Sequence, residues 1–152
     1  MNEHNQTVSV EPSVAILRMI SGFRAARAIY IAAKLGIADL LKDEPKGSGE
    51  LALATKTHAS SLYPVMRALA SAGIFAEDEK GRFMLTPIAD TLRSDVPGSL
   101  RAWAILVLGE EHYEAWGDLM HSVRTGRAGL RACFRYGSVP IRSPASRTRQ
   151  DL

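Results

Sequence analysis

The chain has 152 residues, of which 46% are hydrophobic and 23% are charged, so it can bury the core of about one domain and does not have a disordered composition. Its single cysteine, Cys133, excludes an intramolecular disulfide framework and a cysteine-rich zinc site. The net charge of +3 is unevenly distributed, because residues 127–152 hold six arginines and one acid (net +5) and residues 1–126 are left with −2. The basic character therefore lies in the C-terminal segment, and it does not by itself indicate a nucleic-acid-binding domain.

The first twelve residues are polar and lack the apolar segment of a signal peptide. The longest apolar stretch, residues 25–41, is interrupted by Arg27, Lys34 and Asp39, so no transmembrane span is predicted. We therefore expect a flexible lead-in over residues 1–12, no membrane association and a cytoplasmic protein.

A long helix is predicted from Ser13 onward, with apolar side chains along one stripe. The stretch 25–35 within it is apolar on nearly all sides, and such a helix must be buried on all sides. Either the core of the same chain or a second chain can cover it. We favour a second chain, because the apolar run lies at the edge of the sequence. The predicted homodimer interface consists of Ile16, Ile20, Phe23, Tyr30 and Ile31.

The stretch 48–86 has the pattern of a winged helix: two helices followed by a β-hairpin. Ser48 is the predicted N-cap of a short helix over 50–54. A second helix, which ends before Gly73, is predicted from apolar residues at positions i, i+3, i+4 and i+7: Leu62, Val65, Met66 and Leu69. Strands are predicted at 74–76 and 82–85, on either side of a charged turn. The predicted fold is therefore mainly α, a winged helix with flanking dimerisation helices.

Proline at position 64 lies inside the second predicted helix, and the sequence allows two explanations. The helix either begins at Ser61, where the missing N–H has no consequence, or it kinks at Pro64.

Three further helices are predicted after the hairpin. Thr86 followed by Pro87 is the predicted N-terminus of a short helix over 88–92. The next helix carries Leu100, Trp103, Ala104 and Val107, and a last helix carries His112, Trp116, Leu119, Met120 and Val123 on one face. From residue 127 to 152 the sequence is rich in Arg, Ser and Pro and shows no periodicity, so we expect a tail without a core of its own.

A DNA-binding transcription regulator is the alternative function for a winged helix. Its recognition helix should present several polar or basic side chains to base edges, yet this one offers only His58 and Arg67. The acidic wing tip, Glu77–Glu79, would be repelled by phosphates. We therefore expect no sequence-specific nucleic-acid binding.

The sequence predicts no catalytic residue and no metal ligand. The four histidines do not have the HxxxH or HExxH spacing of a metal site. Cys133 lies between Arg131 and Arg135, which favour a thiolate, but no histidine base is near it in the sequence.

Five short stretches, taken in order, carry a family resemblance: LGIADLL at 35–41, LASAGIF at 69–75, LTP at 85–87, WGDL at 116–119 and SVRTG at 122–126. Over about residues 13–126 the chain resembles the N-terminal dimerisation domain of S-adenosylmethionine-dependent small-molecule O-methyltransferases. The resemblance implies a winged-helix region that interlocks two subunits and does not bind DNA. It also implies that Leu108, His112 and Trp116 lie near a wall of the acceptor pocket. Without a catalytic domain to face, we expect Trp116 to be a core aromatic.

In that family a Rossmann-like domain follows, which binds S-adenosylmethionine and carries the catalytic histidine. Residues 127–152 depart from this pattern, since they have no Asp/Glu-x-Gly-x-Gly loop and are too few to form the sheet. We expect a chain truncated before its catalytic domain, with a shifted reading frame near residues 128–137. Such a chain binds no cofactor by itself, and a separate chain would have to supply the catalytic half.

Overall fold

A computed structural model describes residues 11–127 of the chain. They fall into two compact units that divide between Leu106 and Val107, and each is described by itself. Cys133, residues 1–10 of the predicted lead-in and the tail beyond residue 127 lie outside the described residues. The lead-in was predicted to reach residue 12, but the first helix already begins at Pro12, with Glu11 as its N-cap.

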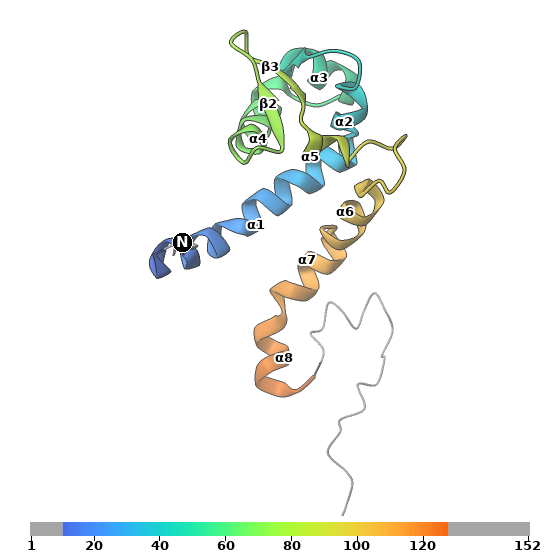
Figure 1. Ribbon diagram of the computed structural model, residues 1–152. Helices are drawn as coiled ribbons and strands as arrows, with labels where there is room; N and C mark the ends of the chain where they lie inside the picture. Colours follow the sequence, from blue (N-terminus) through green and yellow to red (C-terminus); the bar gives the residue numbers. More distant parts are fainter. Residues whose placement is uncertain (1–10, 128–152) are drawn as a thin grey trace, which may run out of the picture. The chain divides into compact units, whose positions relative to one another are not determined.

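The first unit is a winged helix, which confirms the predicted fold class (Figure 1). Helices α3 and α4 form the helix–turn–helix, and strands β2 and β3 form the wing. Its elements in chain order are α1 (Pro12–Leu35), α2 (Ile37–Leu40), β1 (Lys46–Gly47), α3 (Ser48–Thr55), α4 (Ala59–Ser71), β2 (Phe75–Glu77), β3 (Arg82–Leu85), α5 (Pro87–Asp90) and α6 (Arg101–Val107).

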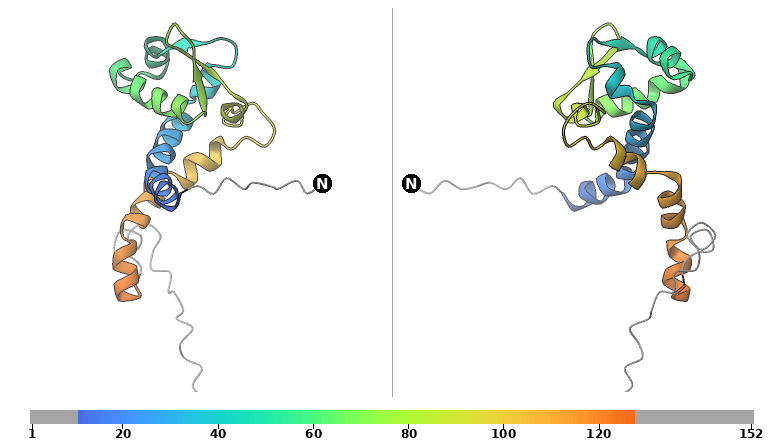
Figure 2. Two further views of the ribbon diagram at one scale, coloured as in Figure 1. Left: turned by 60° about the vertical axis from the view of Figure 1, so that its left-hand side comes forward. Right: turned by 90° about the vertical axis from the view of Figure 1, so that its right-hand side faces the viewer.

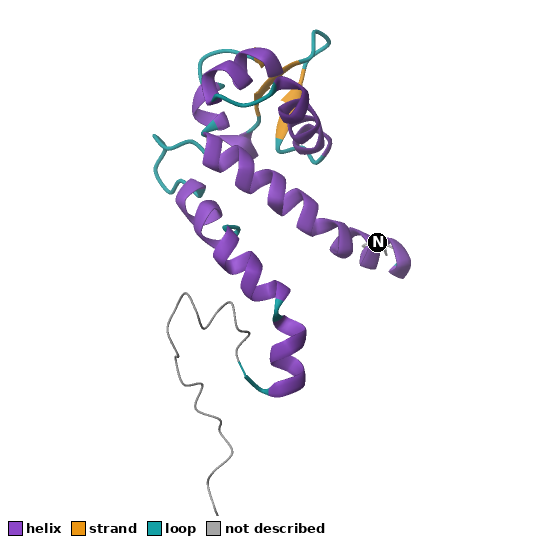
Figure 3. Cartoon of the chain, turned by 180° about the vertical axis from the view of Figure 1, so that it is seen from behind, coloured by secondary structure: helices purple, strands orange, loops and turns teal. Residues whose placement is uncertain are grey.

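The sheet has three antiparallel strands in the order β1–β3–β2, one more than the hairpin that the sequence predicts (Figure 3). Phe83 of the central strand pairs with Glu77 on one side and with Lys46 on the other. Strand β1 has only two residues, too few to show the alternating apolar and polar pattern of a strand. It is a strand only because it pairs with β3.

The core of this unit lies between the helix–turn–helix and the wing. On α4 the buried residues are Leu62, Met66 and Leu69, the face that the apolar spacing predicts. The largest fully buried side chains come from α2, α3, α4 and both wing strands: Phe75, Phe83, Ile37, Leu51, Met66 and Leu69.

Several helix ends follow local sequence signals. Thr86 caps α5, because its hydroxyl accepts the Ala89 N–H at 3.2 Å, as predicted. Gly73, with φ +74°, follows the C-cap of α4 as expected. The N-cap of α3 is Gly47 and not Ser48, and the Gly47 N–H donates to the Glu50 carboxylate at 2.7 Å. Helix α4 begins at Ala59, so of the two explanations for Pro64 the start at Ser61 is ruled out, and Pro64 lies inside the helix.

The second unit contains α7 (Glu110–Gly117) and α8 (Leu119–Thr125) among its described residues. The sequence predicts one helix here, and this prediction is wrong. Asp118, with φ −89° and ψ 6°, is the C-cap of α7, and its N–H donates to the Glu114 carbonyl at 3.1 Å. Neither helix buries a residue.

Candidate dimerisation surface

The N-terminal half of α1, residues 12–24, is called the outer half. It starts at Pro12, and the carboxylate of the N-cap, Glu11, accepts the Ser13 N–H at 3.3 Å. In both views of Figure 2 the outer half extends away from α2–α5. It exposes six large apolar side chains: Val14, Ile16, Leu17, Met19, Ile20 and Phe23. An exposed apolar surface of this extent marks an interaction site.

The C-terminal half of α1 is buried by the chain itself. It packs on α2 and α4, and its buried residues are Ala28, Tyr30, Ala32 and Ala33. The all-round apolar stretch 25–35 therefore finds much of its cover within the chain. The expectation that a second chain supplies this cover does not match the structure, in which α2 and α4 pack on this half of α1. The sequence alone does not show which elements fold back onto α1.

The structure separates the five residues predicted for the interface into two groups. Ile16, Ile20 and Phe23 lie on the outer half, each more than half exposed. Tyr30 is buried in its own chain, with the Arg27 guanidinium 4.8 Å from its ring centroid, and Ile31 is half-buried. The predicted set does not include Val14, Leu17 and Met19, which are also exposed on the outer half; Met19 is 75% exposed. Their apolar character could have indicated that they are part of the exposed surface. The prediction used residues from a single apolar stripe of the helix and therefore left out its other sides.

The outer half is also positively charged. It carries Arg18 and Arg24, the rest of α1 carries Arg27 and Lys34, and α1 contains no acidic residue. The Arg24 guanidinium lies 5.8 Å from the Phe23 ring centroid, which is cation–π distance. A partner surface for the outer half therefore has to be apolar and must tolerate neighbouring cations.

The residues that the resemblance assigns to an acceptor-pocket wall all belong to the second unit. Leu108 and His112 are half-buried, whereas Trp116 is 69% exposed. The expectation that Trp116 is a core aromatic is therefore wrong, because α7 has no core to join within the described residues. His112 and Trp116 are four residues apart on α7, so their side chains share one face of it.

The one basic side chain of the recognition helix α4, Arg67, is engaged within the protein. Its guanidinium lies 3.2 Å from the Glu77 carboxylate in β2 and donates to the Tyr63 hydroxyl at 3.2 Å. The hydrogen bond with Tyr63 and the charge of Glu77 raise the pKa of Arg67 above its ordinary value. The cation that a DNA reader would direct at bases or phosphates instead ties α4 to the wing, which gives no support to the regulator alternative.

At the wing turn, Asp78 accepts the N–H groups of Lys80 and Arg82, each at 2.9 Å, and pairs with the Arg82 guanidinium at 2.8 Å. These hydrogen bonds, that of the Arg82 N–H first, lower the pKa of Asp78 below its ordinary value.

A carboxyl group with a depressed pKa stabilises the fold above the pKa of the unfolded chain, about 3.9, and this stabilisation is lost as the pH falls through the lower, folded value. We expect Asp78→Asn to lower the free energy of unfolding at pH 7, and the difference from wild type to shrink toward zero as the pH falls below about 4. Urea unfolding of both proteins between pH 7 and pH 3 measures this. A difference that stays constant over the whole range would contradict the assigned role of the charge.

The described residues form neither a metal site nor a nucleotide-binding unit. Between residues 11 and 127, no three His, Cys, Asp or Glu side chains gather closely enough to hold a metal ion. No helix in that range is long and apolar enough to cross a membrane. The strands pair only antiparallel, whereas a dinucleotide-type cofactor site requires parallel strands joined through a glycine loop and a helix. S-adenosylmethionine therefore does not fit these residues.

Comparisons with known proteins agree with this fold. Residues 17–95 match the family model of the O-methyltransferase dimerisation domain. A phenazine O-methyltransferase of Lysobacter antibioticus is 46% identical over 134 residues, which is 88% of this chain and 39% of that protein. The O-methyltransferase SfmM3 of Streptomyces lavendulae is 40% identical over 73% of this chain and 33% of its own length.

A solved structure has the same fold over most of this chain. The crystal structure of LaPhzM superposes with a TM-score of 0.76 at 45% identity, covering 85% of this chain and 38% of that one. The chain thus spans between a third and two fifths of the length of these relatives. Because the family model, the relatives and the winged helix with its exposed first helix coincide on the same residues, the chain belongs to the O-methyltransferase dimerisation-domain family.

Proposed function

We propose that the chain forms a homodimer through the outer half of α1. The dimerisation module comprises the predicted residues 13–126 together with Pro12, at which α1 begins, and residues 1–11 and 127–152 lie outside it. The observation that carries this proposal is the set of six exposed apolar side chains on the outer half. Burying them against a second copy removes apolar surface from water, at about 25 cal/mol per Å².

The dimer would serve a methyltransferase that acts on a ring-bearing small molecule in the cytoplasm. The relatives carry names such as phenazine O-methyltransferase and mitomycin biosynthesis 6-O-methyltransferase, and this class of acceptor supports the proposal. Leu108, His112 and Trp116 would contribute one wall of the acceptor site. The cofactor and the catalytic base would come from a domain outside these 152 residues, either on the same polypeptide or on a separate chain.

Light scattering coupled to size-exclusion chromatography tests the homodimer. At micromolar concentration the mass should be twice 16.5 kDa, since a specific interface buries more than about 1,000 Å². A single species of 16.5 kDa would refute the proposal.

These 152 residues alone are expected neither to bind S-adenosylmethionine nor to transfer its methyl group. The reason is that residues 11–127 contain no glycine loop between a parallel strand and a helix that could receive the cofactor. Isothermal titration with S-adenosylmethionine at millimolar concentration should give no saturable heat, and the full-length Lysobacter relative is the matched positive control. One-to-one binding tighter than about 1 mM, or roughly −4 kcal/mol, would contradict this expectation. Activity that appears on adding a separately expressed catalytic half would show that the two parts can act together.

A further inference from the structure

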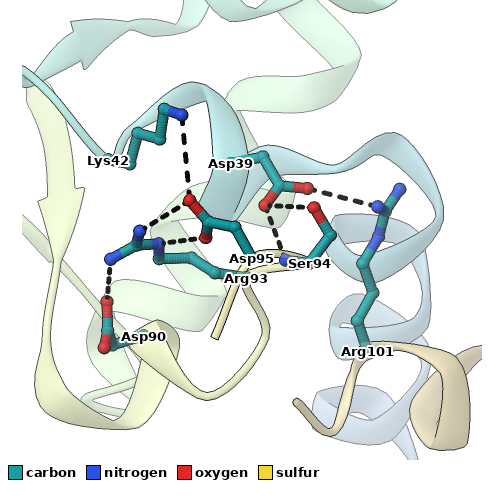
Figure 4. Close-up of polar contacts among 7 residues, drawn as sticks. All are labelled: Asp39, Lys42, Asp90, Arg93, Ser94, Asp95 and Arg101. Carbon is teal, nitrogen blue, oxygen red and sulfur yellow. Dashed lines mark hydrogen bonds and ion pairs between the residues drawn. The ribbon is translucent and has the colours of Figure 1, made fainter. Parts of the chain in front are cut away.

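Three side chains that are distant in sequence meet beside α2. The Asp39 carboxylate accepts the Ser94 N–H at 2.7 Å and the Ser94 hydroxyl at 3.0 Å. Its second oxygen lies 3.2 Å from the guanidinium of Arg101, the first residue of α6 (Figure 4). We call Asp39, Ser94 and Arg101 the Asp39 clasp. It joins segments 55 to 62 residues apart in the sequence.

Arg101 also binds the C-terminal end of α1. Its Nε donates to the Ala33 carbonyl at 2.9 Å. The Ala33 carbonyl also accepts the Gly36 N–H at 3.2 Å, so it is shared between the C-cap of α1 and Arg101. The negative end of the helix dipole lies in this last turn, so a cation is favoured there. Gly36 follows with φ +67°, and a Cβ at this position would come within 3.2 Å of the guanidinium. The end of α1 is thus shaped to receive Arg101.

Helix α6 has little else to hold it on the first unit. Ala104 is its one buried residue, whereas Trp103 and Leu106 are more than half exposed. The preceding loop contains Pro97 and Gly98, the latter with φ +72°. With so little apolar burial, polar contacts at the start of α6 carry a large share of its attachment.

A second group of ion pairs lies next to the clasp but does not reach α6. Arg93 pairs with Asp90 and with Asp95, both at 2.9 Å, and Lys42 lies 3.8 Å from Asp95 (Figure 4). These contacts hold the beginning of the loop. They provide an internal comparison, because the Arg93 contacts are also arginine–carboxylate pairs but have no bond to Arg101; their carboxylates are more exposed, at 45–47% against 27% for Asp39.

We propose that the Asp39 clasp is a latch. When it opens, α6 and the loop before it detach from the end of α1, while the helix–turn–helix and the wing stay folded. The latch is a conformational device separate from the dimer surface, because the clasp residues lie outside the outer half of α1. Its charged partners are about 30% exposed, so dissolved salt weakens it.

Hydrogen–deuterium exchange on the full chain tests the latch. In Asp39→Ala, the exchange rate of residues 101–106 should rise about tenfold or more. Removing a hydrogen bond to a charged group lowers the local stability enough for a change of this size in the opening equilibrium. Exchange in α4 should stay unchanged. Arg101→Ala should give the same regional pattern, since it removes the ion pair and the bond to Ala33. Asp90→Ala is the matched control and should leave α6 exchange at the wild-type rate.

Two results would overturn the proposal. One is unchanged exchange of α6 in both Asp39→Ala and Arg101→Ala. The other is a rise of equal size in α4, because this would mean that the clasp supports the whole fold and does not latch α6 alone. A second measurement addresses the charge directly: raising the salt concentration should speed α6 exchange in the wild type and have less effect in Asp39→Ala. An equal salt effect in both proteins also counts against the latch.

Discussion

Replacing Ile20 with aspartate is expected to convert the dimer into a folded monomer. Ile20 is 60% exposed in the single chain, so the aspartate costs the monomer little. In the proposed interface the same carboxylate would be buried without a partner, at a cost of about 3 kcal/mol or more. The dissociation constant should therefore rise more than about a hundredfold. Light scattering should give a mass of 16.5 kDa in place of twice that value, with an unchanged far-ultraviolet circular dichroism spectrum.

Leu53→Asp is the matched control for this experiment. Leu53 is a large apolar residue that is 84% exposed, but it lies on α3 and not on α1. This variant should remain a dimer. If both variants dissociate, or if Ile20→Asp stays a dimer, the outer half of α1 is not the interface that holds the two copies together.

Replacing Phe83 with alanine is expected to lower the free energy of unfolding by about 3–5 kcal/mol. Phe83 is fully buried on the central strand β3, and its ring centroid lies 6.0 Å from that of Tyr63 on α4. Removing the ring leaves a cavity between the sheet and the recognition helix. Small domains are stable by only about 5–15 kcal/mol, so the loss is a large fraction of the total.

Urea unfolding at one fixed protein concentration measures the effect, because the proposed dimerisation would make the apparent stability depend on concentration. The midpoint should fall while the slope of the transition stays the same. Ile88→Ala is the control, since Ile88 is 57% exposed and its truncation should change the stability by less than about 0.5 kcal/mol. A loss below about 1 kcal/mol for Phe83→Ala would contradict the central position of this ring in the core.

Local signals in the sequence determined much of the winged helix. The apolar spacing of Leu62, Met66 and Leu69 gave the buried face of α4, and Thr86 with Pro87 gave the start of α5. Such signals work because a helix repeats every 3.6 residues and its first N–H groups need a nearby acceptor. The family resemblance could also be read from the sequence, and the family model matches residues 17–95, which contain three of the five stretches that carry it.

Other features depend on residues that meet only after folding. Strand β1 exists because Lys46 pairs with Phe83. The positive charge of Arg67 on the recognition helix is paired with the carboxylate of Glu77. The periodicity of the last helical region did not show that Asp118 divides it into two helices.

By itself, the sequence determined that this chain is a winged helix of the dimerisation-domain type and that its first helix is too apolar to remain fully exposed. Only the tertiary structure decided which part of that helix is available. Packing of α2 and α4 covers its C-terminal half, including Tyr30, and leaves Ile16, Ile20 and Phe23 on the surface. The physical reason is that periodicity reports which side chains avoid water, whereas the choice between a neighbour in the same chain and a second copy depends on contacts between residues far apart in the sequence.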